Sequence, residues 1–162
     1  MTDDSVRMEI KGLTMDPTSK VPIVILHDVE SQLFLPIWIG VLEAQAIALR
    51  IEGVEPPRPM THDLLRNSLD LLEAEVNHIL ISDLKDNTFF ALIHLLHEGA
   101  EIAIDSRPSD AIALALRADA PIFVRRVVLE KAKALDLTET DDDRIRKWLE
   151  QAEPEDLGEY EM

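Results

Sequence analysis

Residues 104–124 read Ile104-Asp-Ser-Arg-Pro-Ser-Asp-Ala-Ile-Ala-Leu-Ala-Leu-Arg-Ala-Asp-Ala-Pro-Ile-Phe-Val124: a strand end, a polar turn, an apolar helix and a second strand. Pro108 suits the first helical position, where its missing N–H would have no partner anyway. Asp110 falls near the third helical position, where a carboxylate meets free backbone N–H groups. The helix over 111–116 has no polar residue and is expected to be buried. Polar groups at the mouth of a buried helix favour a functional site, although a simple helix cap is the plainer explanation.

A second segment, Arg58-Pro-Met-Thr-His-Asp63, repeats the same pattern of an Arg-Pro pair, a hydroxyl and an aspartate at a helix start. Thr61 is the predicted N-cap of the following helix. Its buried stripe is expected to consist of four leucines, Leu64, Leu65, Leu69 and Leu72. Two copies of one local sequence pattern in a small chain indicate either an internal duplication or two walls of one cleft.

The chain as a whole falls into two repeats of three strands and a helix. In the first repeat, strands are predicted over 6–15, 21–27 and 33–39 and an apolar helix over 41–51. In the second, strands are predicted over 76–84, 88–96 and 100–105, followed by the helix that begins at Pro108. The helix after Thr61 links the repeats, and a short strand over 122–124 and a helix over 127–135 follow. The pattern predicts one α+β domain over residues 1–135, with mainly antiparallel sheet built from two β-β-β-α units.

Composition limits the class of protein. The chain has 162 residues, no cysteine and a formal net charge of −16. Without cysteines it can form neither disulfides nor thiolate zinc sites, and its longest apolar runs are too short to cross a bilayer. Its first residues are acidic and polar, unlike a signal peptide. We therefore expect a cytoplasmic protein with no membrane association.

Half of the net negative charge lies in the acidic tail, residues 136–162. This tail holds eleven acids and three bases, a net charge of −8, and the preceding residues hold 21 acids and 13 bases, also −8. A helix is expected over 140–151 with Thr140 as its N-cap, followed by disorder over 155–162. The acidic tail is thus predicted to be a region separate from the domain.

Four motifs, spread over most of the chain, carry a family resemblance. They are Leu35-Pro-Ile-Trp-Ile-Gly40 with Glu43-Ala44, Arg58-Pro59 with Thr61-His-Asp-Leu64, Phe89-Phe-Ala91, and residues 105–114 with Ala120-Pro-Ile-Phe-Val124. In order and spacing, from about Val6 to Lys133, they resemble the bifunctional nuclease (BFN) domain family, formerly a domain of unknown function. The resemblance implies a hydrolase with nuclease activity on DNA and RNA, that is, both a DNase and an RNase.

The polar residues of the two Arg-Pro segments fit the chemistry of a nuclease. The candidate catalytic residues are His62 as general base, Asp63, Asp105 and Asp110. Asp63 and Asp110, and more weakly Glu43, are candidate ligands of Mg²⁺ or Mn²⁺, because hard cations prefer oxygen ligands. The candidate substrate-binding residues are Arg58, Thr61, Arg107 and Ser109, of which the two arginines can pair with phosphate. No organic cofactor is indicated.

The remaining histidines are expected to have ordinary structural roles. His27, His78 and His94 fall in or beside predicted strands, where a core or surface histidine is the simplest interpretation, and His97 falls in a turn.

The acidic balance of the chain weighs against tight binding of nucleic acid, which depends on contacts with Lys and Arg. Nucleic acid is therefore expected only as a weakly bound substrate. The alternative is a non-catalytic oligomeric module that binds an anionic small ligand or a partner protein through Arg58 and Arg107. The helix over 41–51 has more apolar surface than one face of a sheet can cover, which predicts a homo-oligomer, with a dimer favoured.

Overall fold

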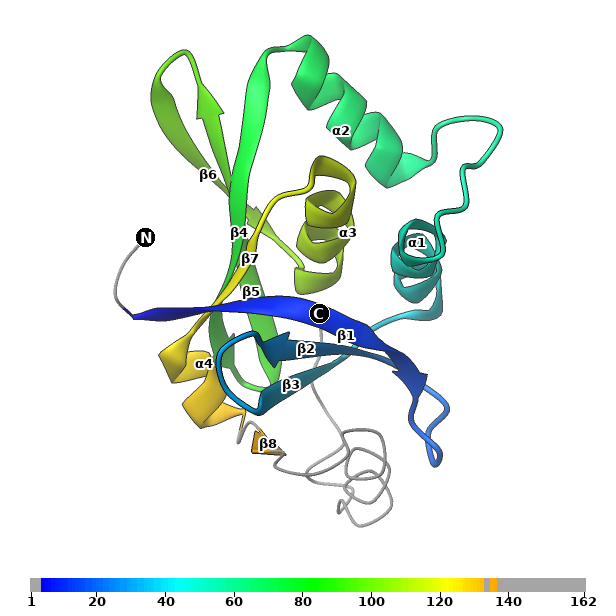
Figure 1. Ribbon diagram of the computed structural model, residues 1–162, viewed down its shortest axis with the longest axis vertical. Coiled ribbons are helices and arrows are strands. Elements are labelled where there is room, and N and C mark those ends of the chain that lie inside the picture. Colours follow the sequence, from blue (N-terminus) through cyan, green and yellow to red (C-terminus); the bar gives the residue numbers. More distant parts are fainter. Residues whose placement is uncertain (1–3, 133–134, 137–162) are drawn as a thin grey trace.

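The computed structural model describes residues 4–132 and 135–136, which form one twisted sheet and the helices around it (Figure 1). The strands are β1 (Ser5–Met15), β2 (Pro22–Asp28), β3 (Leu33–Trp38), β4 (Ala74–Lys85), β5 (Thr88–His97), β6 (Ala100–Ser106), β7 (Ile122–Arg125) and β8 (Leu135–Asp136). The helices are α1 (Val41–Ile51), α2 (Thr61–Leu71), α3 (Pro108–Ala118) and α4 (Arg126–Lys131).

The order of the strands confirms the prediction of two repeats. The sheet runs β6-β5-β4-β7-β1-β2-β3-β8, so each repeat contributes three neighbouring strands. The strand β7 lies between the repeats, antiparallel to β1 and parallel to β4, and every other pairing in the described sheet is antiparallel. The protein is therefore an α+β domain with a mainly antiparallel sheet, as expected.

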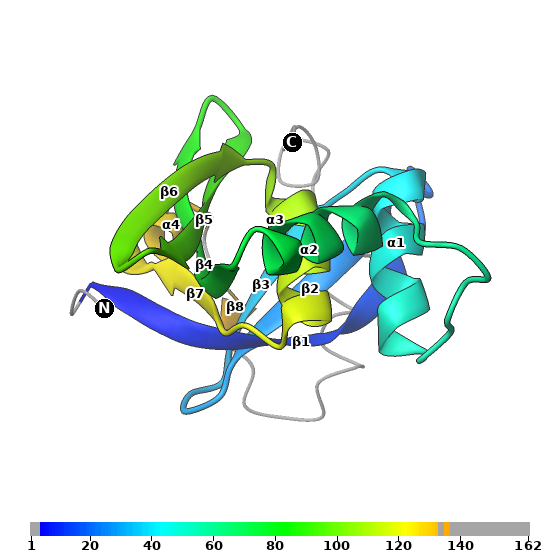
Figure 2. The same ribbon diagram turned by 90° about the horizontal axis from the view of Figure 1, so that it is seen from above.

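The helix α3 is the centre of the domain, as its sequence predicts. Pro108 occupies its first turn, and residues 111–115 are buried against β4 and β5 on one side and against α1 and α2 on the other. Alternating alanines leave space for the neighbouring helices to approach closely. The helix ends where Asp119 adopts a left-handed conformation, with φ of 51°. Figure 2 shows α2 and α3 side by side, with α1 next to them.

The helix α1 is less buried than predicted. We expected it to pack on the sheet, but it lies mainly against α3, and among its residues only Ile47 is fully buried. Val41 and Leu42 remain 68% and 76% exposed. The apolar residues of α1 indicate that the helix is partly buried, but they carry no information about whether the sheet or another helix covers it.

The predictions for α2 were wrong in two respects. Three leucines of the expected buried stripe are exposed, Leu64, Leu65 and Leu72, and only Leu69 packs against the core. The N-cap is Met60 rather than Thr61, and the Asp63 carboxylate accepts the Met60 backbone N–H at 2.9 Å. Because α2 meets the rest of the domain through a narrow contact with α3 and β4, periodicity alone overestimates its buried face.

The end of the described chain also differs from expectation. The helix predicted over 127–135 is shorter, since α4 ends at Lys131, and Leu135–Asp136 instead form the short strand β8 beside β3. The helix and disordered segment predicted over 140–162 lie outside the described residues. No helix among the described residues has the length and apolar character needed to span a membrane.

Candidate active site

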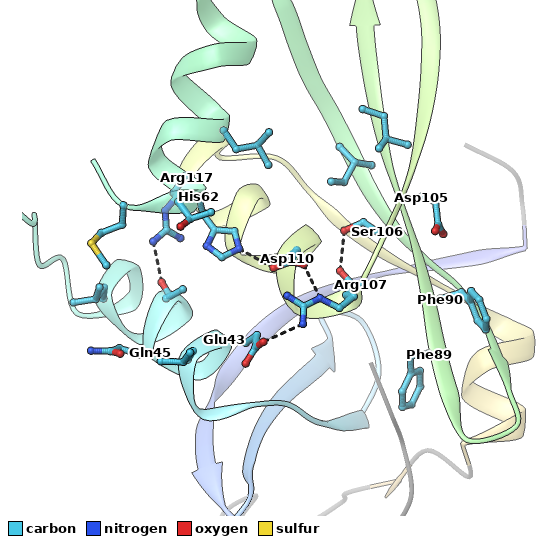
Figure 3. Close-up of a pocket in the computed structure, with 18 of the residues that line it drawn as sticks. Glu43, Gln45, His62, Phe89, Phe90, Asp105, Ser106, Arg107, Asp110 and Arg117 are labelled. Carbon is cyan, nitrogen blue, oxygen red and sulfur yellow. Dashed lines mark hydrogen bonds and ion pairs between the residues drawn. The ribbon is translucent and has the colours of Figure 1, made fainter. Parts of the chain in front are cut away.

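A cleft of about 900 Å³ lies between α1, the start of α2, the β5–β6 hairpin and the start of α3 (Figure 3). Much of its wall is apolar and includes Leu42, Leu65 and Phe89. Polar and charged side chains gather where the three helices meet. A concave, mostly apolar cleft with a few convergent polar groups is the usual form of a ligand site.

Four charged or titratable residues form a continuous chain in this cleft, which we call the cleft cluster: Glu43, His62, Arg107 and Asp110 (Figure 3). His62 Nε2 lies 2.9 Å from one Asp110 carboxylate oxygen, and Arg107 Nε donates to the other at 2.8 Å. Arg107 Nη1 then donates to Glu43 at 3.0 Å. The cluster therefore joins α1, α2 and the first turn of α3.

The backbone of α1 makes room for Glu43. Gly40 stands at the N-terminal end of α1, and a Cβ atom built at this position would overlap the Glu43 carboxylate. A residue without a side chain thus allows Glu43 to fold back over the helix start and face Arg107.

Hydrogen bonds within the cleft cluster stabilise the ionised forms of Asp110 and Arg107. Burial alone would raise the pKa of Asp110, but the hydrogen bonds from Arg107 and His62 outweigh it and hold that pKa below its usual value. The hydrogen bond to Asp110 likewise raises the pKa of Arg107. Asp110 is therefore a carboxylate, and Arg107 a cation, throughout the neutral range.

Two atoms of the cleft cluster are left to meet a ligand. Because Asp110 is an acceptor, His62 Nε2 carries the proton in the neutral ring, and the lone pair is on Nδ1. Arg107 is about half exposed, and within the described residues its Nη2 has no hydrogen-bond partner. The cleft cluster thus offers a proton acceptor and an anion-binding group, held on the two oxygens of the same carboxylate.

A second ion pair fixes the helices that carry the cleft cluster. Arg117, only 5% exposed, donates from Nε to Asp63 at 2.7 Å and from Nη2 to the Ala46 carbonyl at 3.0 Å. Burial would raise the pKa of Asp63, but the Met60 N–H and Arg117 together lower it. This pair ties α3 to both α1 and α2 and acts as the support of the site.

The structure brings together some of the predicted site residues and not others. The two Arg-Pro segments do meet, through His62 and Asp110, and Thr61 also lines the cleft. Asp105 lines it too, but on the β5–β6 hairpin, apart from the cleft cluster (Figure 3). The remaining three candidates do not line the cleft: Arg58 is exposed, Ser109 is buried, and Asp63 is paired with Arg117.

Sequence reasoning missed Arg117. A detectable signal was present, because Arg117 is seven residues after Asp110 and so lies on the same face of α3. A charged residue on the face of a buried helix needs a partner, and the aspartate at the start of α2 provides it.

The cleft does not hold a preassembled metal site. In the part of the chain that the structure describes, no three His, Asp or Glu side chains of the cleft are close enough to share an ion. Arg107 instead forms ion pairs with both Glu43 and Asp110, and its single positive charge offsets one of their two negative charges. A cation can join this arrangement only together with further oxygen ligands, such as those of a phosphate.

Comparisons with known proteins agree with the family resemblance. The sequence model of the bifunctional nuclease domain matches residues 24–136. An uncharacterized protein of Mycobacterium tuberculosis (strain H37Rv) is 35% identical over 161 residues, which cover 93% of this chain and 96% of the relative. Bifunctional nuclease 1 of Oryza sativa subsp. japonica is 26% identical over 107 residues, 64% of this chain and 32% of the relative. Bifunctional nuclease 2 of the same plant is 27% identical over 120 residues, 72% and 37% of the two chains.

Proposed function

The chain belongs to the bifunctional nuclease domain family, and we propose that it is a nuclease that hydrolyses phosphodiester bonds of DNA and RNA in the cleft. The observation that supports this most is the contact between His62 and Asp110, next to the partly exposed guanidinium of Arg107. Hydrolysis of a phosphodiester needs a base, a group that binds the phosphoryl oxygens and a fixed geometry between them. The cleft cluster supplies all three.

In the proposed reaction, Arg107 Nη2 binds a nonbridging oxygen of the phosphate. His62 Nδ1 accepts a proton from a water molecule, whose oxygen forms the new bond to phosphorus as the bond to the leaving oxygen breaks. The leaving oxygen takes a proton from solvent. Asp110 holds the imidazole in the tautomer that leaves Nδ1 free, in the way that a carboxylate orients a catalytic histidine elsewhere.

A cation is part of the proposal. We propose that oxygens of Asp110 and Glu43 would hold Mg²⁺ or Mn²⁺ when substrate is bound, and that the ion would offset charge on the phosphoryl group. Such an ion would reverse the local charge of an acidic site and so offset the repulsion between the chain and a polyanion. Because Asp63 is held by Arg117, we assign it a supporting role in place of the ligand role first expected.

The direct test is cleavage of fluorogenic single- and double-stranded DNA and RNA by the purified full chain, with EDTA, Mg²⁺ or Mn²⁺. We expect weak, cation-dependent cleavage of broad specificity, and its loss in Asp110→Asn and His62→Gln. Arg66→Met, outside the cleft, is the matched control and should keep full activity. Cleavage that is equal in Asp110→Asn and the wild type would show that a contaminant or another site is responsible.

The alternative is a module that binds an anionic small ligand or partner without cleaving it. The apolar lining of the cleft favours this possibility, since an apolar wall with one partly exposed guanidinium group can hold an organic anion. Saturable binding of short oligonucleotides that depends on Arg107, with no cleavage under any of the conditions above, would identify this function instead.

We also propose that the chain forms a homo-oligomer, with a dimer favoured. Several large apolar side chains of α1, of α2 and of its C-cap are more than half exposed: Val41, Leu42, Leu64, Leu71 and Leu72. Exposed apolar surface of this kind is typical of a face that another chain covers.

A further inference from the structure

A second cluster of titratable residues, His78, His94 and Glu101, lies on the sheet, one residue on each of β4, β5 and β6. His78 and His94 are direct partners across the β4–β5 pair, and Glu101 is one diagonal step from His94 on β6. Their neighbours Ile79 and Ile93 belong to the core beneath α3. Because alternate side chains of a strand point to opposite faces, the cluster lies on the face of the sheet opposite α3.

The hydrogen bonds of the two histidines leave the same ring atom free in each. His78 Nδ1 lies 2.6 Å from the Asn77 side-chain oxygen, and His94 Nδ1 lies 3.1 Å from the Glu101 carboxylate. These oxygens are acceptors, so each Nδ1 carries the proton and each Nε2 keeps its lone pair. His94 Nε2 is buried and has no hydrogen-bond partner among the described residues.

A buried acceptor without a partner is costly unless something else occupies it. Histidines that bind a metal through one nitrogen commonly donate the other N–H to a carboxylate or carbonyl oxygen. The bonds to Asn77 and Glu101 have this form. One nitrogen of each histidine and one Glu101 oxygen lie within 4.8 Å of one another, so the three side chains form one compact group.

We propose that His78 and His94 bind a divalent transition-metal ion of the Zn²⁺ class through Nε2, with Glu101 as the oxygen partner that orients His94. Imidazole nitrogen selects Zn²⁺, Cu²⁺ or Ni²⁺ over Mg²⁺, which prefers oxygen. The site is therefore chemically different from the cation proposed in the cleft, and it does not depend on the nuclease proposal.

The two imidazole rings would have to reorient to share one ion. The two rings are stacked, with centroids 4.2 Å apart and an angle of 12° between their planes. The lone pairs of stacked rings lie in nearly parallel planes, so the rings must tilt toward each other to share one ion. Glu101 is 64% exposed at the rim, which gives an ion a route from solvent.

An ion at this place would join three strands of the second repeat. The strand β6 is the edge of the sheet, and all its residues but Ser106 are exposed. A link from β4 and β5 to β6 would hold this edge in register beside the cleft, whose wall includes Ile104 and Asp105 of the same strand.

The test is calorimetric titration of the metal-free full chain with Zn²⁺, together with NMR of the imidazole nitrogens. We expect one ion per chain, with shifts of Nε2 in His78 and His94. Affinity should fall at least 100-fold in His94→Gln and His78→Gln, and 10- to 100-fold in Glu101→Gln, as for loss of an outer partner. His97→Gln is the matched control, because His97 is on the same strand but outside the cluster, and it should bind normally.

Either of two results would overturn the proposal. One is Zn²⁺ binding of equal affinity in the His78→Gln/His94→Gln double variant. The other is the absence of any change at His78 and His94 in the wild-type spectrum, a readout that stands even where a variant fails to fold. Cleavage in Mg²⁺ after removal of Zn²⁺ tests the nuclease proposal separately, so each can fail without the other.

Discussion

Arg117→Met is expected to lower the free energy of unfolding by about 3–4 kcal/mol. The Arg117 side chain is 4% exposed and donates three hydrogen bonds, to Asp63, to the Ala113 carbonyl and to the Ala46 carbonyl. Removing one partner of a buried ion pair costs about 3–5 kcal/mol. We expect the lower part of this range, because Asp63 is 27% exposed and keeps its bond from the Met60 N–H.

The measurement is urea and thermal unfolding followed by far-ultraviolet circular dichroism at neutral pH. For a chain of this size, each kcal/mol corresponds to roughly 2–4 °C in the melting temperature, so a decrease of about 10 °C is expected. Arg66→Met is the matched control, since Arg66 pairs with Asp70 at 2.8 Å on the exposed surface of α2. Such exposed pairs are worth roughly 0.5 kcal/mol or less.

The difference in the free energy of unfolding between the wild type and Arg117→Met should depend on pH, and this dependence identifies the ion pair. The pKa of Asp63 is lower in the folded protein than its ordinary value. The stability contributed by the pair is thus fully present above about pH 4, the unfolded value, and is lost as pH falls through the folded value. The difference in the free energy of unfolding between the wild type and Arg117→Met should therefore become smaller at acidic pH. The reasoning would be refuted if Arg117→Met lost no more stability than Arg66→Met, or if the difference in the free energy of unfolding stayed constant down to low pH.

Four further outcomes are expected. His62→Gln should lower the cleavage rate by roughly 10²–10⁴-fold with an unchanged circular dichroism spectrum, and a rate within twofold of the wild type would exclude His62 as the base. Deleting residues 136–162 changes the formal net charge from −16 to −8 and should raise the cleavage rate, most strongly at low salt. An increase that is the same at all salt concentrations would contradict the electrostatic argument. Leu71→Asp replaces a side chain that is 85% exposed and should reduce the oligomer seen by sedimentation equilibrium, whereas a monomeric wild type would end the assembly proposal. The hydrogen bond from Lys131, with that from the Leu84 N–H, lowers the pKa of Asp83 to about 2, so Lys131→Met should return it toward the ordinary value in an NMR titration, and an unmoved pKa would assign the shift to the backbone.

Much of the fold could be predicted because the local signals agree with the tertiary structure. The proline at the start of α3 and the apolar run after it specify a buried helix, and the turn at Lys85-Asp-Asn87 specifies the β4–β5 hairpin. The burial of α2 could not be predicted in this way. A leucine stripe shows which face of a helix is apolar, but not whether another element of the same chain covers it.

The candidate site was predictable only in part, for a similar reason. The two Arg-Pro segments share residue types, which favoured their convergence, and His62 does meet Asp110 across 48 positions of sequence. The arginine that meets Asp63 is nevertheless Arg117 and not either arginine of the Arg-Pro pairs. Long-range pairing of this kind depends on how α2 crosses α3, which no local pattern encodes.

The histidine cluster depends on an irregularity of the sheet. A regular hairpin that pairs Lys85 with Thr88 would place His78 opposite Leu95. The bulge between Ile81 and Asp83 shifts the register by one residue, so that His78 faces His94 instead. Two histidines that read as ordinary strand residues in the sequence thus become neighbours through a feature that sequence patterns do not show.

The place of β7 in the sheet determines when the chain can fold during its synthesis. Until Ile122–Arg125 are inserted, β1 and β4 each end a separate three-stranded unit with an unpaired edge. Because β7 follows α3 in the chain, the ribosome must release nearly the whole domain before the two units can join. Synthesis that stops before Ile122 therefore yields a fragment whose strands β1 and β4 are open edges, which are templates for aggregation, and not a smaller folded domain.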